Sequence, residues 1–474
     1  MRRIFFILIY IISSVTAYGQ ALTFSLAEEM MLSGNLEIQT AREVVRLSEI
    51  ELKAMRGLRY PNIDFMGGYM LMQRDVEIDL GGSKGALSNA TQHIINEGVD
   101  NGIISPGVAE FIASGISPLL AADWSFILQK RSAMLGAVSL VQPIYMGGKI
   151  NAAIASAEIE VSSARYKLQA TINRKLTELV ELYYGVIIAQ MAVDLRQKSV
   201  DGLRNHLEDA QALEQEGMIP NSEVLYVKYK LSESERDLHL AHSKLTIAQD
   251  ALSRLLGCNV NEKLANRIFI VETIYSLEYY IENGINLNPI LLDVKSKIAL
   301  SEQGVNIARA ELLPQVAAFG GAIVASHNLT ELMPRWNIGV GMQLNIFDGL
   351  GKERRLMAAK QANRVAHTAI NDAESEIRLL INNEYYSVIN SLYDVSSCNS
   401  TIEFTRSYLQ AKSEGFKEGL TPSSEVVDAQ IALCGAELER SVAAFSFCKS
   451  LARLLEASGL SHTFNEYQEK AIFM

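Results

Sequence analysis

The side chains that could bind a metal ion or take part in catalysis form a few small groups. His239 and His242 lie three residues apart in a predicted helix, with Glu235 four residues before the first histidine, a spacing that can bind a metal ion. A solvated helix face explains the same residues, and we favour that interpretation. The segment Met146–Lys149 lacks the upstream glycine of a phosphate-binding loop, and the chain has no Gly-x-Ser-x-Gly motif. We therefore expect no enzyme: no catalytic residue, no cofactor site and no metal site.

A second group is acidic and recurs in both halves of the chain. Glu425 and Asp428 lie three residues apart and so share one face of a predicted helix, and Glu223 and Tyr226 occupy the corresponding positions in the first half. Acids in the first turn of a helix compensate its macrodipole. Acids that line an aqueous passage concentrate cations and repel anions. Both interpretations stay open for Glu223 and Glu425.

The four cysteines are Cys258, Cys398, Cys434 and Cys448. Cys434 and Cys448 fall on one predicted helix about 21 Å apart, too far for a disulfide. Cys398 and Cys434 are offset by about 9 Å if their helices run antiparallel from a turn near Gly419. We therefore expect free, buried thiols.

Charge and composition exclude other classes of protein. The 474 residues include 43 Lys and Arg against 54 Asp and Glu, a formal charge of −11, whereas nucleic-acid binding needs clustered basic charge. We expect no nucleic-acid partner. Hydrophobic residues make up 49% of the chain and charged residues 20%, which suits a large folded core. Only nine prolines occur, which favours extended helices.

The N-terminus has the pattern of a secretory signal peptide. Arg2 and Arg3 precede a short apolar run, and small residues lead to a predicted cleavage site after Gly19. A retained anchor helix is less favoured because the run is shorter than the roughly 20 residues that span a bilayer. Further along the chain we find no uninterrupted run of about 18 apolar residues and expect no transmembrane helix. An exported protein of this kind is soluble or forms a β-barrel.

The chain is internally duplicated. The segments around Pro61 and Pro314 match at an offset of 253 residues, and segments 216–224 and 418–426 match at an offset of 202 residues. The first half therefore carries about 51 extra residues, which fall between Pro61 and Pro143. The predicted divisions are a signal peptide 1–19, a first structural repeat 20–257, a connector 258–284, a second structural repeat 285–457 and a C-terminal tail 458–474.

Each repeat is expected to contain a helix, two strands, a very long helix, a turn and a further helix. Residues 336–346 alternate apolar side chains with polar or small ones, as in a barrel strand between lipid and water, and residues 63–71 do so more weakly. A half-buried strand in a soluble sheet is the alternative. Residues 149–215 and 352–417 contain no proline, and their apolar positions step by three and four. That pattern predicts two coiled-coil helices of about 100 Å.

Glycines end both long helices. Gly217 and Gly419 suit the C′ position, where the backbone adopts positive φ. A polar residue is expected to cap the helix that follows each turn. The expected N-caps are Asn221 or Ser222 in the first repeat and Ser423 or Ser424 in the second.

The extra material of the first half, about residues 73–130, joins the two strands of that repeat. In a membrane barrel a loop of this length lies outside the cell. Pro106 and Pro118 interrupt its apolar stretches. We expect short helices folded over the barrel mouth as a cap or constriction.

Taken in order, these motifs resemble the TolC family of outer-membrane efflux channels over nearly the whole mature chain. The resemblance rests on Gln142–Gly148 with its echo Asn345–Gly349, and on the turn Gly419–Ala429. It implies a mainly α fold with a membrane β-barrel portion, in which four strands per subunit join a barrel shared by a homotrimer. The coiled-coil helices would form an α-helical tunnel in the periplasm. The implied location is the cell outer membrane, in contact with outer-membrane lipid.

The resemblance also implies a function and its sites. The protein would be a passive exit duct for small molecules, working with a periplasmic membrane-fusion adaptor protein and an inner-membrane pump. The turns Gly217-Met218 and Gly419-Leu420 would face the periplasm and receive the adaptor. Glu425, Asp428 and Glu223 would form an acidic ring at the entrance.

The strands give an independent reason for oligomerisation. Four strands cannot close a barrel, because the smallest bacterial membrane barrels use about eight. Open edges in lipid would leave backbone groups unsatisfied at several kcal/mol each. At least two chains must therefore share the barrel, and three follows from the resemblance. Two alternatives stay open: a type I protein secretion duct, and a soluble periplasmic coiled-coil scaffold with a small four-stranded sheet.

Overall fold

The computed structural model describes residues 22–101, 103–260, 264–330 and 334–473. The signal peptide expected at residues 1–19 lies outside the described residues. The chain divides into two compact units. The sheet unit comprises residues 54–152 and 306–356, and the helical unit comprises the rest. Both structural repeats contribute to both units.

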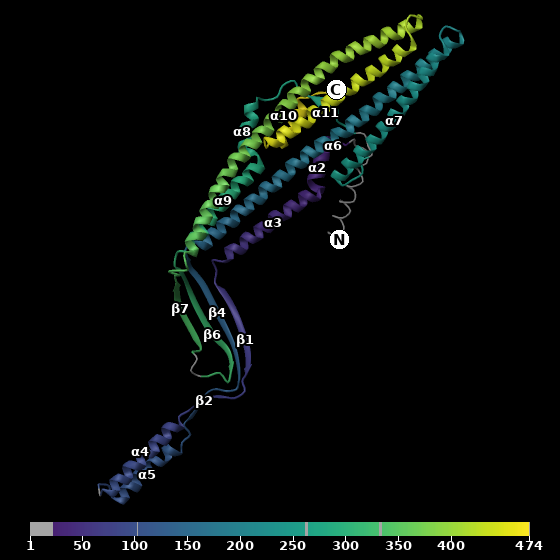
Figure 1. Cartoon of the computed structure of the whole chain (residues 1–474). Helices are drawn as coiled ribbons and strands as arrows, with labels where there is room; N and C mark the ends of the chain where they lie inside the picture. Colours follow the sequence, from purple (N-terminus) through teal and green to yellow (C-terminus); the bar gives the residue numbers. More distant parts are fainter. Residues whose placement is uncertain (1–21, 102, 261–263, 331–333, 474) are drawn as a thin grey trace, which may run out of the picture. The chain divides into compact units, whose positions relative to one another are not determined.

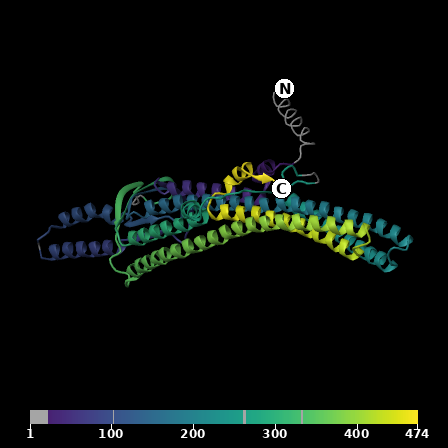
Figure 2. The same ribbon diagram turned by 90° about the horizontal axis from the view of Figure 1, so that it is seen from above.

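The helical unit holds the long helices and several short ones (Figures 1 and 2). The helices that lie in it wholly or in large part are α2 (Phe24–Gly34), α3 (Leu36–Gly57), α6 (Lys149–Gln215), α7 (Asn221–Leu256), α8 (Leu277–Leu287), α9 (Pro289–Ala310), α10 (Gly351–Lys417), α11 (Ser423–Ala457) and α12 (Phe464–Glu469). A short sheet pairs β5 (Phe269–Ile270), in the predicted connector, with β8 (Ile472–Phe473), in the predicted tail.

The structure repeats element by element, as the sequence predicts. Helices α2 and α8 have 11 residues each and α3 and α9 have 22, and both pairs are offset by 253 residues. Helices α6 and α10 have 67 residues each and are offset by 202. At 1.5 Å per residue each long helix spans about 100 Å. The two long helices run side by side, with α7 and α11 folded back along them (Figure 1).

The predicted ends of the long helices are confirmed, whereas the predicted N-caps are wrong. Gly217 and Gly419 have φ of +70° and +72°. The N-caps of α7 and α11 are Pro220 and Pro422, and neither supplies a side-chain hydrogen bond. Proline fixes φ near the value of the first helical turn. With ψ of 151° and 155° the two prolines set the entry to each helix, so the polar residues that follow are already helical.

The core of the helical unit is aromatic. Tyr183 and Tyr184 of α6 are fully buried and pack with Phe24, Phe269 and Phe464, which come from three other elements. The Tyr183 hydroxyl donates a hydrogen bond of 2.7 Å to a backbone carbonyl near the start of α2. The core thereby joins the first repeat to the connector and the tail.

One helix of the described chain is long and apolar enough, by length and composition, to cross a membrane. Helix α6 contains an 18-residue window with a mean hydropathy of 1.4, long and apolar enough by composition to do so. Half of that window is buried inside the structure. Its apolar side chains include Leu179 and Val180, which belong to the core of the helical unit. The window passes the composition test although polar residues interrupt its apolar runs.

All four cysteines are free, as predicted, but they are not all buried. Cys398 and Cys448 are buried, while Cys258 and Cys434 are partly exposed. Burial raises the pKa of Cys448 to about 12. Its thiol is therefore protonated and inert at neutral pH.

The larger sheet of the sheet unit is antiparallel, in the order β1-β4-β6-β7 (Figure 1). The strands are β1 (Asn62–Leu71), β4 (Ser132–Met146), β6 (Gln315–His327) and β7 (Trp336–Gln343). In the middle of the sheet their register aligns the predicted alternation across all four strands. One cross-strand row is Phe65, Val138, Ala322 and Trp336. The next row is Asp64, Ser139, Gly321 and Asn337.

Successive rows point to opposite faces of a sheet, so one face is apolar and the other polar or small at this level. The predicted four-strand contribution of each subunit is present.

The extra segment of the first half has its own structure. Strands β2 (Val76–Asp79) and β3 (Ser125–Gln129) pair with each other. Between them in the sequence lie helices α4 (Gly81–Asp100) and α5 (Pro106–Ala121). Short helices are present as predicted. Of the two prolines expected to interrupt the segment, Pro106 begins α5, whereas Pro118 lies inside it. A proline removes one backbone hydrogen bond. The helix nevertheless continues for another turn, because the Ala122 N–H bonds to the Pro118 carbonyl at 3.1 Å.

Asn288 allows a test of the packing between repeats. Its Oδ1 accepts bonds of 2.9 and 3.2 Å from the first turn of α9, and its Nδ2 donates to the Ala457 carbonyl at 2.8 Å. Asn288 is 3% exposed. Because buried backbone groups would lose partners, Asn288→Ala should lower the free energy of unfolding by about 1–3 kcal/mol. Chemical denaturation of the purified protein measures this.

The matched control is Asn35→Ala. Asn35 caps α3 in the same way, but among the described residues its Nδ2 has no hydrogen bond like that of Asn288 to Ala457. Removal of the Asn35 cap should lower the free energy of unfolding by about 1 kcal/mol or less. Equal losses for the two variants would contradict the role given to the Asn288–Ala457 bond.

Candidate functional site at the helical turns

Two short turns join the antiparallel helices of the helical unit. In the first, the Met218 N–H donates to the Leu213 carbonyl at 2.9 Å, and in the second the Leu420 N–H donates to the Gly415 carbonyl at 2.8 Å. These bonds, with a glycine of positive φ before each donor, define the Schellman motif. The side chains of Met218 and Leu420 are 63% and 82% exposed. Each predicted turn, Gly217-Met218 and Gly419-Leu420, thus presents one apolar side chain to solvent.

A small core holds the ends of the four helices together. Its buried members come from α6, α7, α10 and α11: Leu203, Ala210, Val224, Val227, Phe416, Val426 and Val427. This turn core is separate from the aromatic core. It fixes the positions of the polar groups nearby.

A polar chain crosses the turn core. The Glu223 carboxylate of α7 accepts a 3.0 Å hydrogen bond from the backbone N–H of Ser423, the first residue of α11. The Ser423 hydroxyl lies 2.6 Å from Nε2 of His206 on α6. The His206 ring packs edge-on against Phe416 of α10 at 4.6 Å. One acid, one hydroxyl and one imidazole therefore connect all four helices.

The other predicted acids also have partners on neighbouring helices. Glu425 forms an ion pair with Lys412 of α10, and Asp428 accepts a 3.4 Å hydrogen bond from the Tyr226 hydroxyl of α7. The hydrogen bond to Glu425 raises the pKa of Lys412. Burial, followed by the charge of Asp428, raises the pKa of Tyr226. Glu425 is thus charge-compensated, whereas Asp428 is not paired with a cation among the described residues.

The sequence pattern did not single out Lys412 or His206. Lys412 could have been found, because Lys412 and Glu425 stand at nearly equal distances on either side of the turn and must therefore face each other on antiparallel helices. His206 offered no such signal. Its partner Ser423 is 217 residues away.

The candidate metal residues do not converge. Glu235 forms a 2.7 Å ion pair with Arg204 of α6, and His239 is exposed on α7. In the described ranges, no group of three or more His, Cys, Asp or Glu side chains could hold a metal ion.

Comparisons with known proteins agree with this architecture. A family model described as "Outer membrane efflux protein" matches residues 128–258 and 281–460. The alkaline protease secretion protein AprF of Pseudomonas aeruginosa is 21% identical over 317 residues, which cover 64% of this chain and 65% of AprF. The match thus spans slightly less than two thirds of that relative's length.

Two solved outer-membrane channels share the fold. OprN superimposes with a TM-score of 0.72 at 15% identity, covering 92% of this chain and 89% of OprN. CmeC of Campylobacter jejuni superimposes with a TM-score of 0.71 at 12% identity, covering 94% of this chain and 89% of CmeC. The fold is therefore that of an outer-membrane channel subunit.

The chain belongs to the outer membrane efflux protein family. The predicted resemblance is confirmed. Its fold is that of the solved outer-membrane channels.

Burial lowers the pKa of His206 below its usual 6.5, although the nearby Asp209 and Glu223 act in the opposite direction. The folded state therefore favours the neutral form of His206, and the unfolded chain protonates this residue more readily. The contribution of neutral His206 to the free energy of unfolding is fully present above about pH 6.5 and is lost as the pH falls below that value. Hydrogen exchange of the amides around Ser423, corrected for intrinsic rates, should accelerate between pH 7.5 and 5.5.

His206→Gln should abolish this pH response. The control His239→Gln, at an exposed position on α7, should keep it. A response that persists in His206→Gln would show that another group carries it.

Proposed function

We propose that this protein is the exit duct of a tripartite export system, assembled as a homotrimer and coupled to a periplasmic adaptor and an inner-membrane pump. The observation that carries the proposal is the four-stranded sheet with one apolar face and two open edges, in a family of outer-membrane efflux proteins. The strands contribute to a barrel in lipid, and the helices to a tunnel. Transport through the duct is passive.

The open edges support assembly. Strands β1 and β7 each pair on one side only in the described part of the chain. In lipid their free backbone groups need partners, and β1 of a neighbouring copy is the strand that β7 can join. Three copies would supply enough strands to close a membrane barrel.

The exposed turns support contact with an adaptor. Met218 and Leu420 are large apolar side chains at the ends of helix pairs, where solvent exposure is unfavourable. Methionine and leucine at such positions suit a partner helix with an apolar stripe. The adaptor would therefore dock at both turns of each subunit.

Two cargo classes fit the fold. Small molecules are the proposed cargo, because the solved relatives with this fold are outer-membrane channels and the family is described by efflux. Protein secretion is the second candidate, favoured by the similarity to the alkaline protease secretion protein AprF. Deletion of the gene should raise susceptibility to toxic small molecules in the first case and deplete a secreted protein from the medium in the second.

Membrane fractionation tests the proposal itself. The protein should sediment with the outer membrane and require detergent for release. Recovery in the soluble periplasmic fraction would establish the coiled-coil scaffold instead.

The acidic ring predicted for the entrance leads to a test of selectivity. If Asp428 lines the passage, three copies concentrate cations there, whereas Lys412 already compensates Glu425. Glu425→Gln with Asp428→Asn should reduce cation selectivity of purified trimers in planar bilayers, and Asp428→Asn alone should account for most of the loss. Lys412→Met should increase it.

Glu418→Gln, at an exposed position beside the turn, is the control and should leave selectivity unchanged. Equal selectivity in the double variant and the unmodified protein would assign Glu425 and Asp428 to helix packing and adaptor contact.

A further inference from the structure

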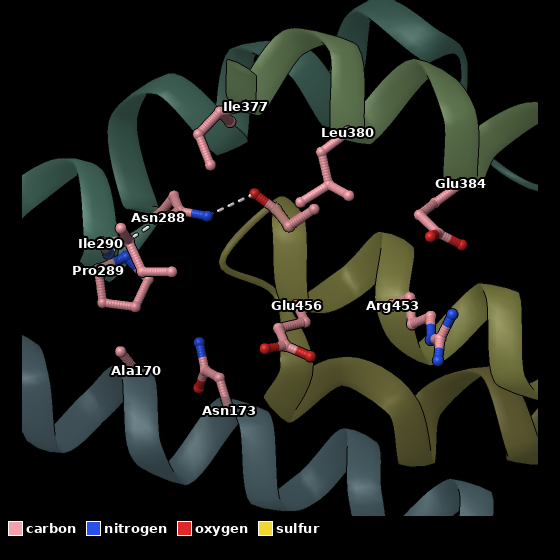
Figure 3. Close-up of a pocket in the computed structure, with 11 residues that line it drawn as sticks. Ala170, Asn173, Asn288, Pro289, Ile290, Ile377, Leu380, Glu384, Arg453 and Glu456 are labelled. Carbon is pink, nitrogen blue, oxygen red and sulfur yellow. Dashed lines mark hydrogen bonds between the residues drawn. The ribbon is translucent and has the colours of Figure 1, made fainter. Parts of the chain in front are cut away.

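A pocket of about 250 Å³ lies where α11 ends and α9 begins, between the long helices α6 and α10 (Figure 3). Its apolar lining includes Ile290, Ile377 and Leu380. Its ionisable lining consists of Glu384, Arg453 and Glu456. All of these residues belong to the helical unit.

Asn173 of α6 presents an unused donor to this pocket. The residue is 3% exposed, and its Oδ1 accepts a 2.9 Å hydrogen bond from Gln169. Its Nδ2 has no hydrogen-bond acceptor among the described residues, and Figure 3 shows the nitrogen directed into the space between the helices. Buried amide groups are almost always hydrogen-bonded. The pocket therefore offers a donor that suits an acceptor on a ligand.

The pocket also holds carboxylates without a bonded cation. Neither Glu384 nor Glu456 makes a side-chain hydrogen bond or ion pair with another described residue. Arg453 and Lys449 act on Glu384 through space only, and the Arg453 guanidinium bonds instead to Glu181 at 2.8 and 2.9 Å. Lys449 is 3.9 Å from the same carboxylate. Burial raises the pKa of Glu384, an effect that the nearby Arg453 opposes only in part.

The duplication provides an internal comparison. The equivalent pocket of the first repeat lies where α7 ends and α3 begins. There Lys175 bonds to Glu37 at 2.8 Å and to Glu178 at 2.7 Å, so both acids are paired. Leu182 stands at the position of Glu384. Of the two equivalent pockets, only that of the second repeat holds acids without a directly bonded cation.

We propose that the pocket of the second repeat binds small organic ammonium ions that carry an apolar group. The ammonium lies between Glu384 and Glu456, and the apolar group packs on Ile377 and Leu380. A hydroxyl or carbonyl on the ligand accepts from Asn173 Nδ2. None of the residues that line this pocket belongs to the turns or to the four-stranded sheet, so a negative result here would leave the proposed function unaffected.

The test uses the purified full-length protein in a neutral maltoside detergent. The probe is 2-amino-1-phenylethanol, which has an ammonium group, a ring and a hydroxyl, and the neutral comparison is 1-phenyl-1,2-ethanediol. Titration calorimetry at pH 7 should show at least tenfold tighter binding of the amine. Glu384→Gln with Glu456→Gln should weaken amine binding at least tenfold, and each single variant severalfold. Asn173→Leu should weaken the binding of both compounds.

Glu178→Gln is the matched control, because it removes an acid from the equivalent pocket. The affinity of this variant for the amine should stay within twofold of that of the unmodified protein. Thermal unfolding establishes that each variant is folded, and the single variants decide the outcome if the double variant is not. Equal affinity for amine and diol, or no loss in the acid variants, would overturn the proposal.

Discussion

The open edges of one sheet constrain the rest of this molecule. Strand β1 and strand β7 each have a pairing partner on one side only within the described residues. Unsatisfied backbone groups in lipid cost several kcal/mol each. A single chain of this outer-membrane family therefore cannot be stable in the bilayer by itself. The proposed closure by other copies uses both repeats, since each repeat supplies two strands and the helices that follow them.

The duplicated helices have diverged where polar side chains meet. At one turn Glu425 pairs with Lys412, while its counterpart Glu223 caps the neighbouring helix through Ser423. Near the aromatic core, one pocket has its acids paired and the other does not. The shared backbone sets the positions, and single substitutions of polar residues give each repeat a distinct role.

Local patterns predicted much of the fold. The absence of proline and the spacing of apolar residues gave helices within one residue of α6 and α10, and glycine chemistry placed both turns. The N-caps were wrong because Pro220 and Pro422 determine the entry geometry. Contacts across long sequence separations could not be predicted. His206 meets Ser423, and Asn173 faces the pocket at the start of α9, only because separate helices pack together.

Cysteine cross-linking across the sheet edges tests the central claim most directly. One cysteine replaces Ile338 on β7, a second scans β1 from Asn62 to Leu71, and the four native cysteines are removed. Oxidation in outer membranes should link one chain to the next at a specific register and give a ladder that ends at three subunits. A soluble monomer without cross-links, or a ladder that continues past three subunits, would contradict a closed barrel shared by a trimer.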